Sequence, residues 1–303
     1  MANLKDIRGR IASVKNIRKI TRAMEMISAA RLRRAEQRIE QLRPYADAIR
    51  RMTARASQAA ENIPNLPILQ EKESVETVGI LLITGDRGLA GPFNSQIVRA
   101  GNRRAATLKA EGKSALWYAV GRRGVSSLEF RQLELGDSWT GFTDRPSFAD
   151  ARAVADGLTA AYVDGKVDRV EIVYNGYISA VRQEVREETL LPLQQADVIG
   201  GEAEASEDEA GEDKPEGRAL WIYEPDPEEI LARLVPDYVE ISIYRALLES
   251  TASEHGARMS AMRNASDNAA ELIDDLTLAA NRQRQAEITQ EIMEVVAGAE
   301  GLR

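Results

Sequence analysis

The sequence predicts an α/β fold: N- and C-terminal helices form a long antiparallel coiled coil, and an open, Rossmann-like α/β domain is inserted between them. Three observations support this: helical spacing of apolar residues at both ends, strand-like patterning in the middle, and a very long last helix. Tyr238 to Val296 contains no proline and one glycine, Gly256. About sixty helical residues would extend about 90 Å, far beyond the radius of gyration of roughly 19 Å expected of a compact chain. Such a helix needs a companion to cover its apolar stripe.

The other end of the chain supplies that companion helix. Apolar residues recur every three or four positions from Leu4 to Met52, which indicates a long amphipathic helix. Pro44 lies inside this stretch, and we expect it to bend or restart the helix. Two prolines mark residues 62–73 as a linker. We therefore assign residues 1–62 to an N-terminal coiled-coil helix.

The middle of the chain, residues 63–226, changes to the short apolar runs of an open sheet with crossover helices. Its first run, Thr77–Thr84, ends at a glycine-rich turn that leads toward a helix, as expected at the start of an α/β domain. The other expected elements are helices over Gln96–Ala110 and Phe148–Tyr162 and strands over Ala115–Val120, Arg169–Tyr174, Val181–Leu190 and Leu220–Tyr223.

Two features mark the return to helix. In residues 202–217 all charged residues but Lys214 are acidic, and the segment is too poor in apolar side chains to join a core, so we expect a loop. The sequence Asp226-Pro227-Glu228-Glu229 then favours a helix start, because proline and carboxylates suit the first turn. We assign residues 227–303 to a C-terminal coiled-coil helix and its tip. This helix is longer than its partner, so its tip exposes apolar residues that a socket on another protein could cover: Ile288, Ile292, Met293, Val295 and Val296.

Composition narrows the possible chemistry. The chain has no cysteine and a single histidine, His255, which excludes disulfides and thiolate ligands and argues against histidine metal sites or triads. We treat His255 as an ordinary helix residue. No paired carboxylates stand at the end of an apolar strand, so we expect no catalytic residues, metal or cofactor. Neither a run of eighteen apolar residues nor a signal-peptide core is present, so we expect a soluble, cytoplasmic protein unless a partner holds it at a membrane.

Two stretches leave other functions open. The turn with Gly85, Gly88 and Gly91 could hold phosphate on its backbone amides. It lacks P-loop and dinucleotide-binding spacing, however, so a tight turn with positive φ is favoured. The basic segment Lys5–Arg55 could bind nucleic acid, but it lacks stacking aromatic residues, and an acidic protein partner or solvent is favoured. A stand-alone coiled-coil adaptor, a nucleic-acid-binding structural protein and an enzyme built on the central sheet remain alternatives.

Three parts of the chain resemble one known family, the gamma subunit of F-type (rotary) ATP synthase, bacterial type. Ile7–Arg38 resembles the opening helix of that family. The segment ITGDRGLAGPFN, Ile83–Asn94, resembles its ITxDRGLCG segment, with Ala90 where cysteine is common. Ser253–Ala269 and Arg284–Ala299 resemble its C-terminal signature. Together these matches span nearly the whole chain.

The resemblance implies a non-catalytic rotor shaft in a proton-transporting two-sector ATPase. It places the helix pair inside the hexameric ring of alpha and beta subunits, with the tip in an apolar bearing. It places the α/β domain beside the epsilon subunit on the membrane c-ring, at the cytoplasmic face of the bacterial inner membrane, as a peripheral subunit. It implies no cofactor, no direct small-molecule ligand and no nucleic acid. Each orientation of the shaft must favour one conformation of a beta subunit, because a shaft that bound all conformations with equal affinity would not change their populations.

The resemblance also assigns contact residues. Met24 matches a methionine that faces the charged loop of beta near the neck of the shaft. Six polar residues match positions where the family's shaft makes polar contacts with a beta subunit, a set of contacts called the catch. Without the resemblance, we would expect these residues only to be solvated: Arg258, Arg284, Gln285, Thr289, Glu291 and Glu294. The match favours a role in the catch most strongly for Arg284, Gln285 and Thr289. The acidic loop 202–217 departs in length and charge from the foot loops usual in the family.

Overall fold

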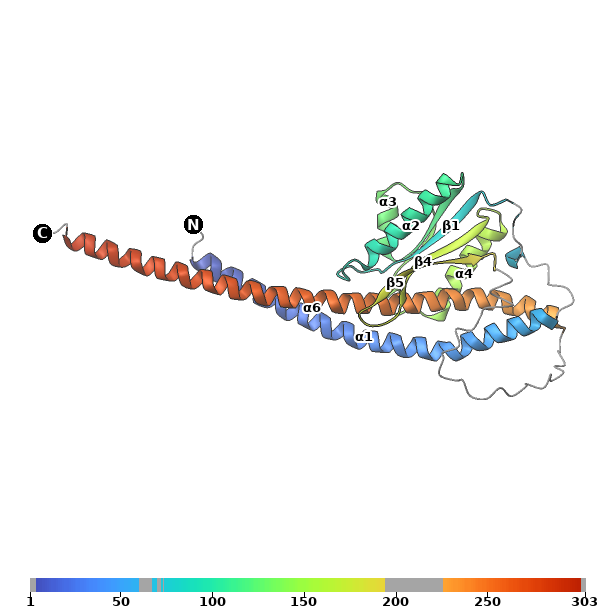
Figure 1. Ribbon diagram of the computed structural model, residues 1–303, viewed down its shortest axis with the longest axis horizontal. Coiled ribbons are helices and arrows are strands. Elements are labelled where there is room, and N and C mark those ends of the chain that lie inside the picture. Colours follow the sequence, from blue (N-terminus) through green and yellow to red (C-terminus); the bar gives the residue numbers. More distant parts are fainter. Residues whose placement is uncertain (1–3, 60–66, 70–71, 73, 194–225, 301–303) are drawn as a thin grey trace.

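The computed structural model describes residues 4–59, 67–69, 72, 74–193 and 226–300. It is a rod with an α/β domain against one end (Figure 1). The rod consists of α1 (Leu4–Ala59) and α6 (Pro227–Glu300), which run antiparallel side by side. At the end away from the domain, α6 continues well past the start of α1. The predicted fold class is confirmed. The acidic loop 202–217 and the expected strand Leu220–Tyr223 lie outside the described residues.

The α/β domain contains one five-stranded sheet with the order β3-β2-β1-β4-β5. Neighbouring strands are parallel except at β5, which pairs antiparallel with β4. The domain elements, in chain order, are η1 (Pro67–Leu69), β1 (Thr77–Ile83), α2 (Phe93–Ala110), β2 (Ser114–Val120), α3 (Arg122–Phe130), β3 (Leu135–Trp139), α4 (Phe148–Val163), β4 (Arg169–Tyr177) and β5 (Gln183–Leu191).

Helices cover both faces of this sheet, and β1 is buried between them. Successive side chains of a strand point to opposite faces. Leu81 and Ile83 therefore join a core with α4 and the first part of α6, whereas Ile80 and Leu82 join a second core with α2 and α3. The C-terminal helix thus has two roles: its first part is a layer of the domain, and the rest is the rod.

Pro44, expected to bend or restart the first helix, does not restart it, because α1 is one helix from Leu4 to Ala59. Pro236 likewise lies inside α6. Proline removes one helical hydrogen bond, but packing can maintain the helix across it. Here Ile49, Leu234 and Ile241 form a buried cluster between the two helices. The expected bend is present, since α1 changes direction in its second half (Figure 1).

Three elements of the domain were missed from the sequence: α3, β3 and the short 3-10 helix η1 within the expected linker. The β3 strand, Leu-Gly-Asp-Ser-Trp, is the parallel edge of the sheet and its three middle residues are exposed. It therefore lacks the apolar run that indicated the central strands. The α3 helix is short and begins directly after Gly121, whose φ is 91°.

Candidate functional site: the root and the tip of the shaft

The centre of α6 is buried on every side where it passes between α1 and the sheet. Every residue from Ala246 to Gly256, which we call the root, is buried. Small side chains make this possible: Ala252 contacts Leu32 and Ala35 of α1. A Cβ atom at Gly256 would lie 3.0 Å from the backbone oxygen of Ala180. The root therefore holds rod and domain in close contact.

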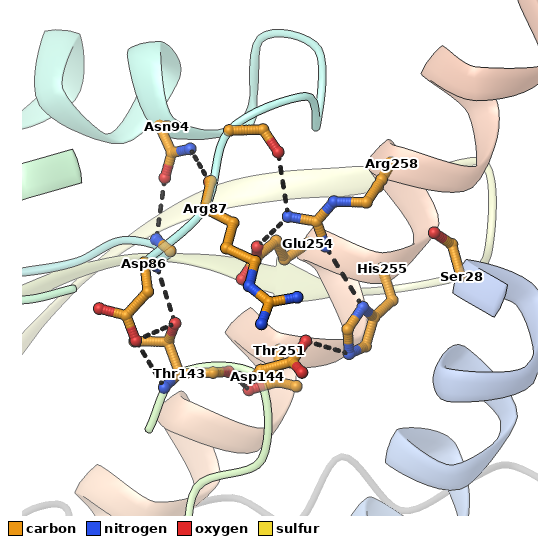
Figure 2. Close-up of polar contacts among 12 residues, drawn as sticks. Ser28, Asp86, Arg87, Asn94, Thr143, Asp144, Thr251, Glu254, His255 and Arg258 are labelled. Carbon is orange, nitrogen blue, oxygen red and sulfur yellow. Dashed lines mark hydrogen bonds and ion pairs between the residues drawn. The ribbon is translucent and has the colours of Figure 1, made fainter. Parts of the chain in front are cut away.

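One ion pair of α6 lies beneath the glycine-rich turn (Figure 2). Glu254 pairs with Arg258 one helical turn later, and both side chains are less than 10% exposed, at 4% and 8%. Burial raises the pKa of Glu254, and Arg258 opposes this rise. Arg258 also donates to the backbone oxygen of Gly88 at 3.3 Å. A Cβ atom at Gly85 would lie 2.7 Å from the Glu254 carboxyl carbon, so glycine permits the turn to rest on this charge pair.

Asp86 ties the same turn to the loop that follows β3. Its carboxylate accepts hydrogen bonds from the backbone N–H groups of Arg122, Gly141 and Thr143, at 3.1, 2.9 and 3.2 Å, and from the Thr143 hydroxyl at 3.0 Å. Burial alone would raise the pKa of Asp86, but these bonds lower it below its usual value. The turn thus connects β1, α3 and the loop before α4.

The glycines of this turn differ in what they provide. Gly91 has a positive φ of 55°, as expected, and Leu89 shares that conformation at 65°. Gly85 and Gly88 instead allow close approach, to Glu254 and to Arg123 respectively. The N–H groups of Gly85 and Asp86 donate to Asn94 and Thr143, both at 2.8 Å. Two amides that a phosphate would require are therefore already bonded within the domain, which favours a structural turn.

His255, expected to be an ordinary helix residue, lies near the C-terminal end of the root. Its side chain is 2% exposed, and Nε2 lies 3.8 Å from an Asp144 oxygen. Burial lowers its pKa to about 4; Asp144 opposes this shift, while Arg258 and Arg31 reinforce it. The imidazole is therefore neutral at neutral pH. A sequence signal did exist, because this histidine stands in a run of small residues between Glu254 and Arg258.

Two of the predicted contact residues, Met24 and Arg258, meet at one place beside the root. They line a cavity of about 400 Å³ together with Arg87, Leu89 and Arg123. Leu89 is 65% exposed and Met24 is half-buried. Arg258, by contrast, is buried by its contacts within the chain. A contact between Arg258 and a partner stays a prediction, and the structure gives this residue a definite internal role.

The other predicted contact residues lie far along α6. Arg284, Gln285, Thr289, Glu291 and Glu294 are all exposed. The Thr289 hydroxyl donates to the backbone oxygen of Gln285 at 2.9 Å, and Glu294 accepts from Gln290 at 3.0 Å. With about 1.5 Å of rise per residue, Arg284 lies about 39 Å from Arg258 along the helix. A catch that includes both Arg258 and Arg284 would therefore have to extend over this length of the helix.

Near the end of α6, the segment Ile288–Ala297, which we call the tip, is exposed at every residue. Apolar side chains are prominent in it, with exposed fractions of 48% for Ile288, 57% for Ile292, 63% for Met293, 72% for Val295 and 48% for Val296. Here α6 extends beyond the N-terminal end of α1 (Figure 1). The exposure that the sequence predicted is present, and the bearing contact stays a prediction.

Within the described ranges, no group of histidine, aspartate and glutamate side chains is arranged to hold a metal ion. None of the helices in that part of the chain combines the length and apolarity that crossing a membrane requires.

The comparison with known proteins agrees with this architecture. The family model for ATP synthase matches residues 3–302. An ATP synthase gamma chain from Rubrobacter xylanophilus is 44% identical over 303 residues, covering 100% of this chain and 99% of the relative. The chain belongs to the ATP synthase gamma chain family. A gamma chain from Moorella thermoacetica is 42% identical, and the match covers 100% of both proteins.

Solved structures show the same fold. One chain of the Tetrahymena thermophila mitochondrial ATP synthase, from a central stalk and c-ring structure, is 27% identical with a TM-score of 0.58; the match covers 82% of this chain and 99% of that one. A chain of the Euglena gracilis mitochondrial ATP synthase, from an OSCP/F1/c-ring structure, is 20% identical with a TM-score of 0.68, covering 99% and 94%. The family assignment favours a role in ATP synthase over the stand-alone adaptor.

Proposed function

We propose that the chain is the central rotor shaft of an F-type ATP synthase. It couples proton-driven rotation of the c-ring to conformational cycling of the catalytic beta subunits, and it works in reverse during ATP hydrolysis. One observation carries this proposal: α6 is buried on all sides at its root and exposed at every residue of its tip. A helix fixed at one end and projecting at the other is suited to act as a lever.

The projecting rod and the α/β domain contact different partners in this proposal. The rod lies inside the hexameric ring of alpha and beta subunits, and the apolar tip turns in a bearing formed by that ring. Arg284, Gln285 and Thr289 form the centre of the polar catch, with Glu291 and Glu294 beside them. The α/β domain rests with the epsilon subunit on the c-ring, at the cytoplasmic face of the bacterial inner membrane. The similar Tetrahymena chain comes from a structure of a central stalk and c-ring, which supports this arrangement.

The chain itself is non-catalytic in this proposal. The carboxylates closest to the glycine-rich turn are engaged within the chain: Asp86 accepts four hydrogen bonds, and Glu254 pairs with Arg258. Neither is free to act as a general base. The chain acts instead by differential contact, because an asymmetric shaft can stabilise one beta conformation over the others only if its contacts with them differ.

The direct test is purification of the tagged chain from its native cell, with identification of the co-purifying subunits by mass. We expect larger subunits in fixed stoichiometry and a magnesium-dependent ATPase activity that the chain alone lacks. Recovery of the chain by itself, or with nucleic acid that dissociates at high salt, would contradict the proposal.

A further inference from the structure

The N-terminal helix is held from two sides where it passes the α/β domain. On one side lies the loop between β3 and α4. The Arg31 guanidinium forms an ion pair with Asp144 of this loop. Two turns further on, Arg38 donates to the backbone oxygen of Pro146, and at 3.0 Å to the hydroxyl of Tyr244 on α6. Charged donors thus join α1 to the loop at two levels.

On the other side lies the β4–β5 hairpin. The Tyr177 hydroxyl donates to the carboxylate of Glu36. The Tyr177 side chain also contacts the buried cluster of Leu32, Ala35 and Ala252 between the two helices. The hairpin therefore makes one polar contact with α1 and also covers the seam between α1 and α6.

Helix geometry shows that these contacts grip α1 from opposite flanks. With 3.6 residues per turn, each residue advances about 100°. Arg31 and Arg38 then lie within about 20° of each other, whereas Glu36 lies about 140° from Arg31. The buried residues Leu32 and Ala35 fall between these directions, at about 100° and 40°. Any roll of α1 about its axis must therefore stretch or break a contact on one flank.

The two helices depend on the domain in different ways. Val235, Val239, Ile243 and Leu247 of α6 lie in the core beneath the sheet. The two clusters on the faces of the sheet are built from the domain and α6, without described α1 side chains. A turning force on the domain thus reaches α6 through its core. It must reach α1 through the flanking contacts or through α6.

We propose that Arg31, Glu36, Arg38, Asp144, Pro146 and Tyr177 form a two-sided clamp that transmits torque from the α/β domain to α1. We call this set the α1 clamp. Asp144 and Tyr177 are its positioning residues on the domain, because each fixes one flank of the helix. The proposal rests on the proposed rotor function and deepens it: the clamp keeps the two helices turning as one body under load.

A reversible bridge tests the clamp in the assembled complex. Because the chain has no cysteine, Arg31→Cys/Asp144→Cys can be joined specifically with a short thiol-bridging reagent. The same preparation is then compared with and without the bridge. A matched control is Glu229→Cys/Arg233→Cys, which replaces an exposed ion pair of 2.9 Å between two residues of α6 and therefore does not join α1 to the domain.

We expect the unbridged clamp variant to hydrolyse ATP at the normal rate without load, but to rotate more slowly than the unsubstituted complex under viscous load. The bridge should restore loaded rotation, and bridging the control pair should change nothing. Amides of α1 around Arg31 should exchange with solvent about tenfold faster without the bridge, since a charged hydrogen bond that limits local opening is lost.

A second variant keeps the test decisive if the first one assembles poorly. Asp144→Asn/Tyr177→Phe removes the charge from one flank and the hydroxyl from the other, and its loss of loaded rotation should exceed the sum of the single losses. Equal loaded rotation in this variant and in the bridged and unbridged forms would overturn the clamp. Failure of the rotor proposal has another signature: the unsubstituted complex would hydrolyse ATP without any rotation of this chain.

Discussion

The root and the tip belong to one helix and have opposite environments. Every residue of the root, Ala246–Gly256, is buried, and every residue of the tip, Ile288–Ala297, is exposed. The root nevertheless contains serine, threonine, glutamate and histidine, while the tip contains isoleucine, methionine and valine. The difference in burial between these two regions of α6 therefore follows close packing rather than hydropathy. The exposed apolar tip indicates a surface completed by another molecule. Substitutions at the root should alter the stability of the chain, and substitutions at the tip should alter its assembly.

The largest expected difference comes from removing one arginine just after the root and one just before the tip. Arg258→Ala leaves Glu254 as an unpaired buried charge, which should lower the free energy of unfolding by about 3–5 kcal/mol. Arg284→Ala, on the exposed part of α6, should change it by less than about 0.5 kcal/mol. Urea denaturation of the full chain measures both. Similar losses at the two positions would show that the root is not the charge-dependent region described here.

A change of side-chain volume sharpens the same comparison. Ala252 is fully buried against Leu32 and Ala35, so Ala252→Leu should destabilise the chain by up to about 3 kcal/mol through overpacking. Ala279 is exposed, and Ala279→Leu should stay within about 0.5 kcal/mol. The same denaturation experiment checks this pair. Tolerance of leucine at residue 252 would mean that rod and domain are loosely joined.

The buried histidine makes the stability of the root depend on pH. The pKa of His255 falls from 6.5 to about 4 in the folded chain. Its contribution to stability is therefore full above pH 6.5 and decreases as the pH falls toward 4. The groups that face it are Asp144 and Arg31 across the interface, with Arg258 on its own helix. Between pH 7.5 and pH 5 the loss should be about 2 kcal/mol.

The variant His255→Asn isolates this titration from that of the carboxylates. Its unfolding free energy should fall by about 2 kcal/mol less over the same pH interval, as measured by denaturation at each pH. Parallel pH profiles for the two proteins would be inconsistent with a neutral, buried imidazole in the root.

The smallest effect on the chain itself is expected at the tip. Ile292→Ser/Val295→Ser changes two exposed side chains, so the free energy of unfolding should move by less than about 0.5 kcal/mol. In the complex, the loss of apolar contact should weaken retention of the larger subunits. Gln290→Ser, an exposed polar position on the same turns, is the control. Equal retention by the variant and the control would remove the argument for an apolar bearing.

Much of the architecture was predictable because long helices and central strands leave periodic signals. The stripe over residues 4–52 gave α1, and the run at Thr77–Thr84 gave β1. The polar edge strand β3 left no such signal. The exposure of the tip was also predictable, since one helix is longer than its partner and nothing else in the described chain covers its end.

The root was the part that sequence reasoning missed. The residues Ser250, Thr251, Ser253, Glu254 and His255 resemble a solvated helix face, yet all are buried. Their partners are loops and strands distant in sequence: Thr251, for example, donates to the backbone oxygen of Thr143 at 2.9 Å. Helical periodicity describes one helix at a time, and it carries no information on which loops will later cover that helix. Close approach of three layers requires small side chains, and hydropathy does not detect this requirement.

The central claim is that this chain turns as one rotor within a complex that hydrolyses ATP. The most direct test places a single cysteine at Asp137, an exposed residue of β3, in a chain that otherwise has none. A probe attached there is followed in single complexes whose larger subunits are fixed to a surface. The account predicts continuous rotation of the probe in one direction when ATP and magnesium are added. A probe that stays still while the complex hydrolyses ATP would contradict it.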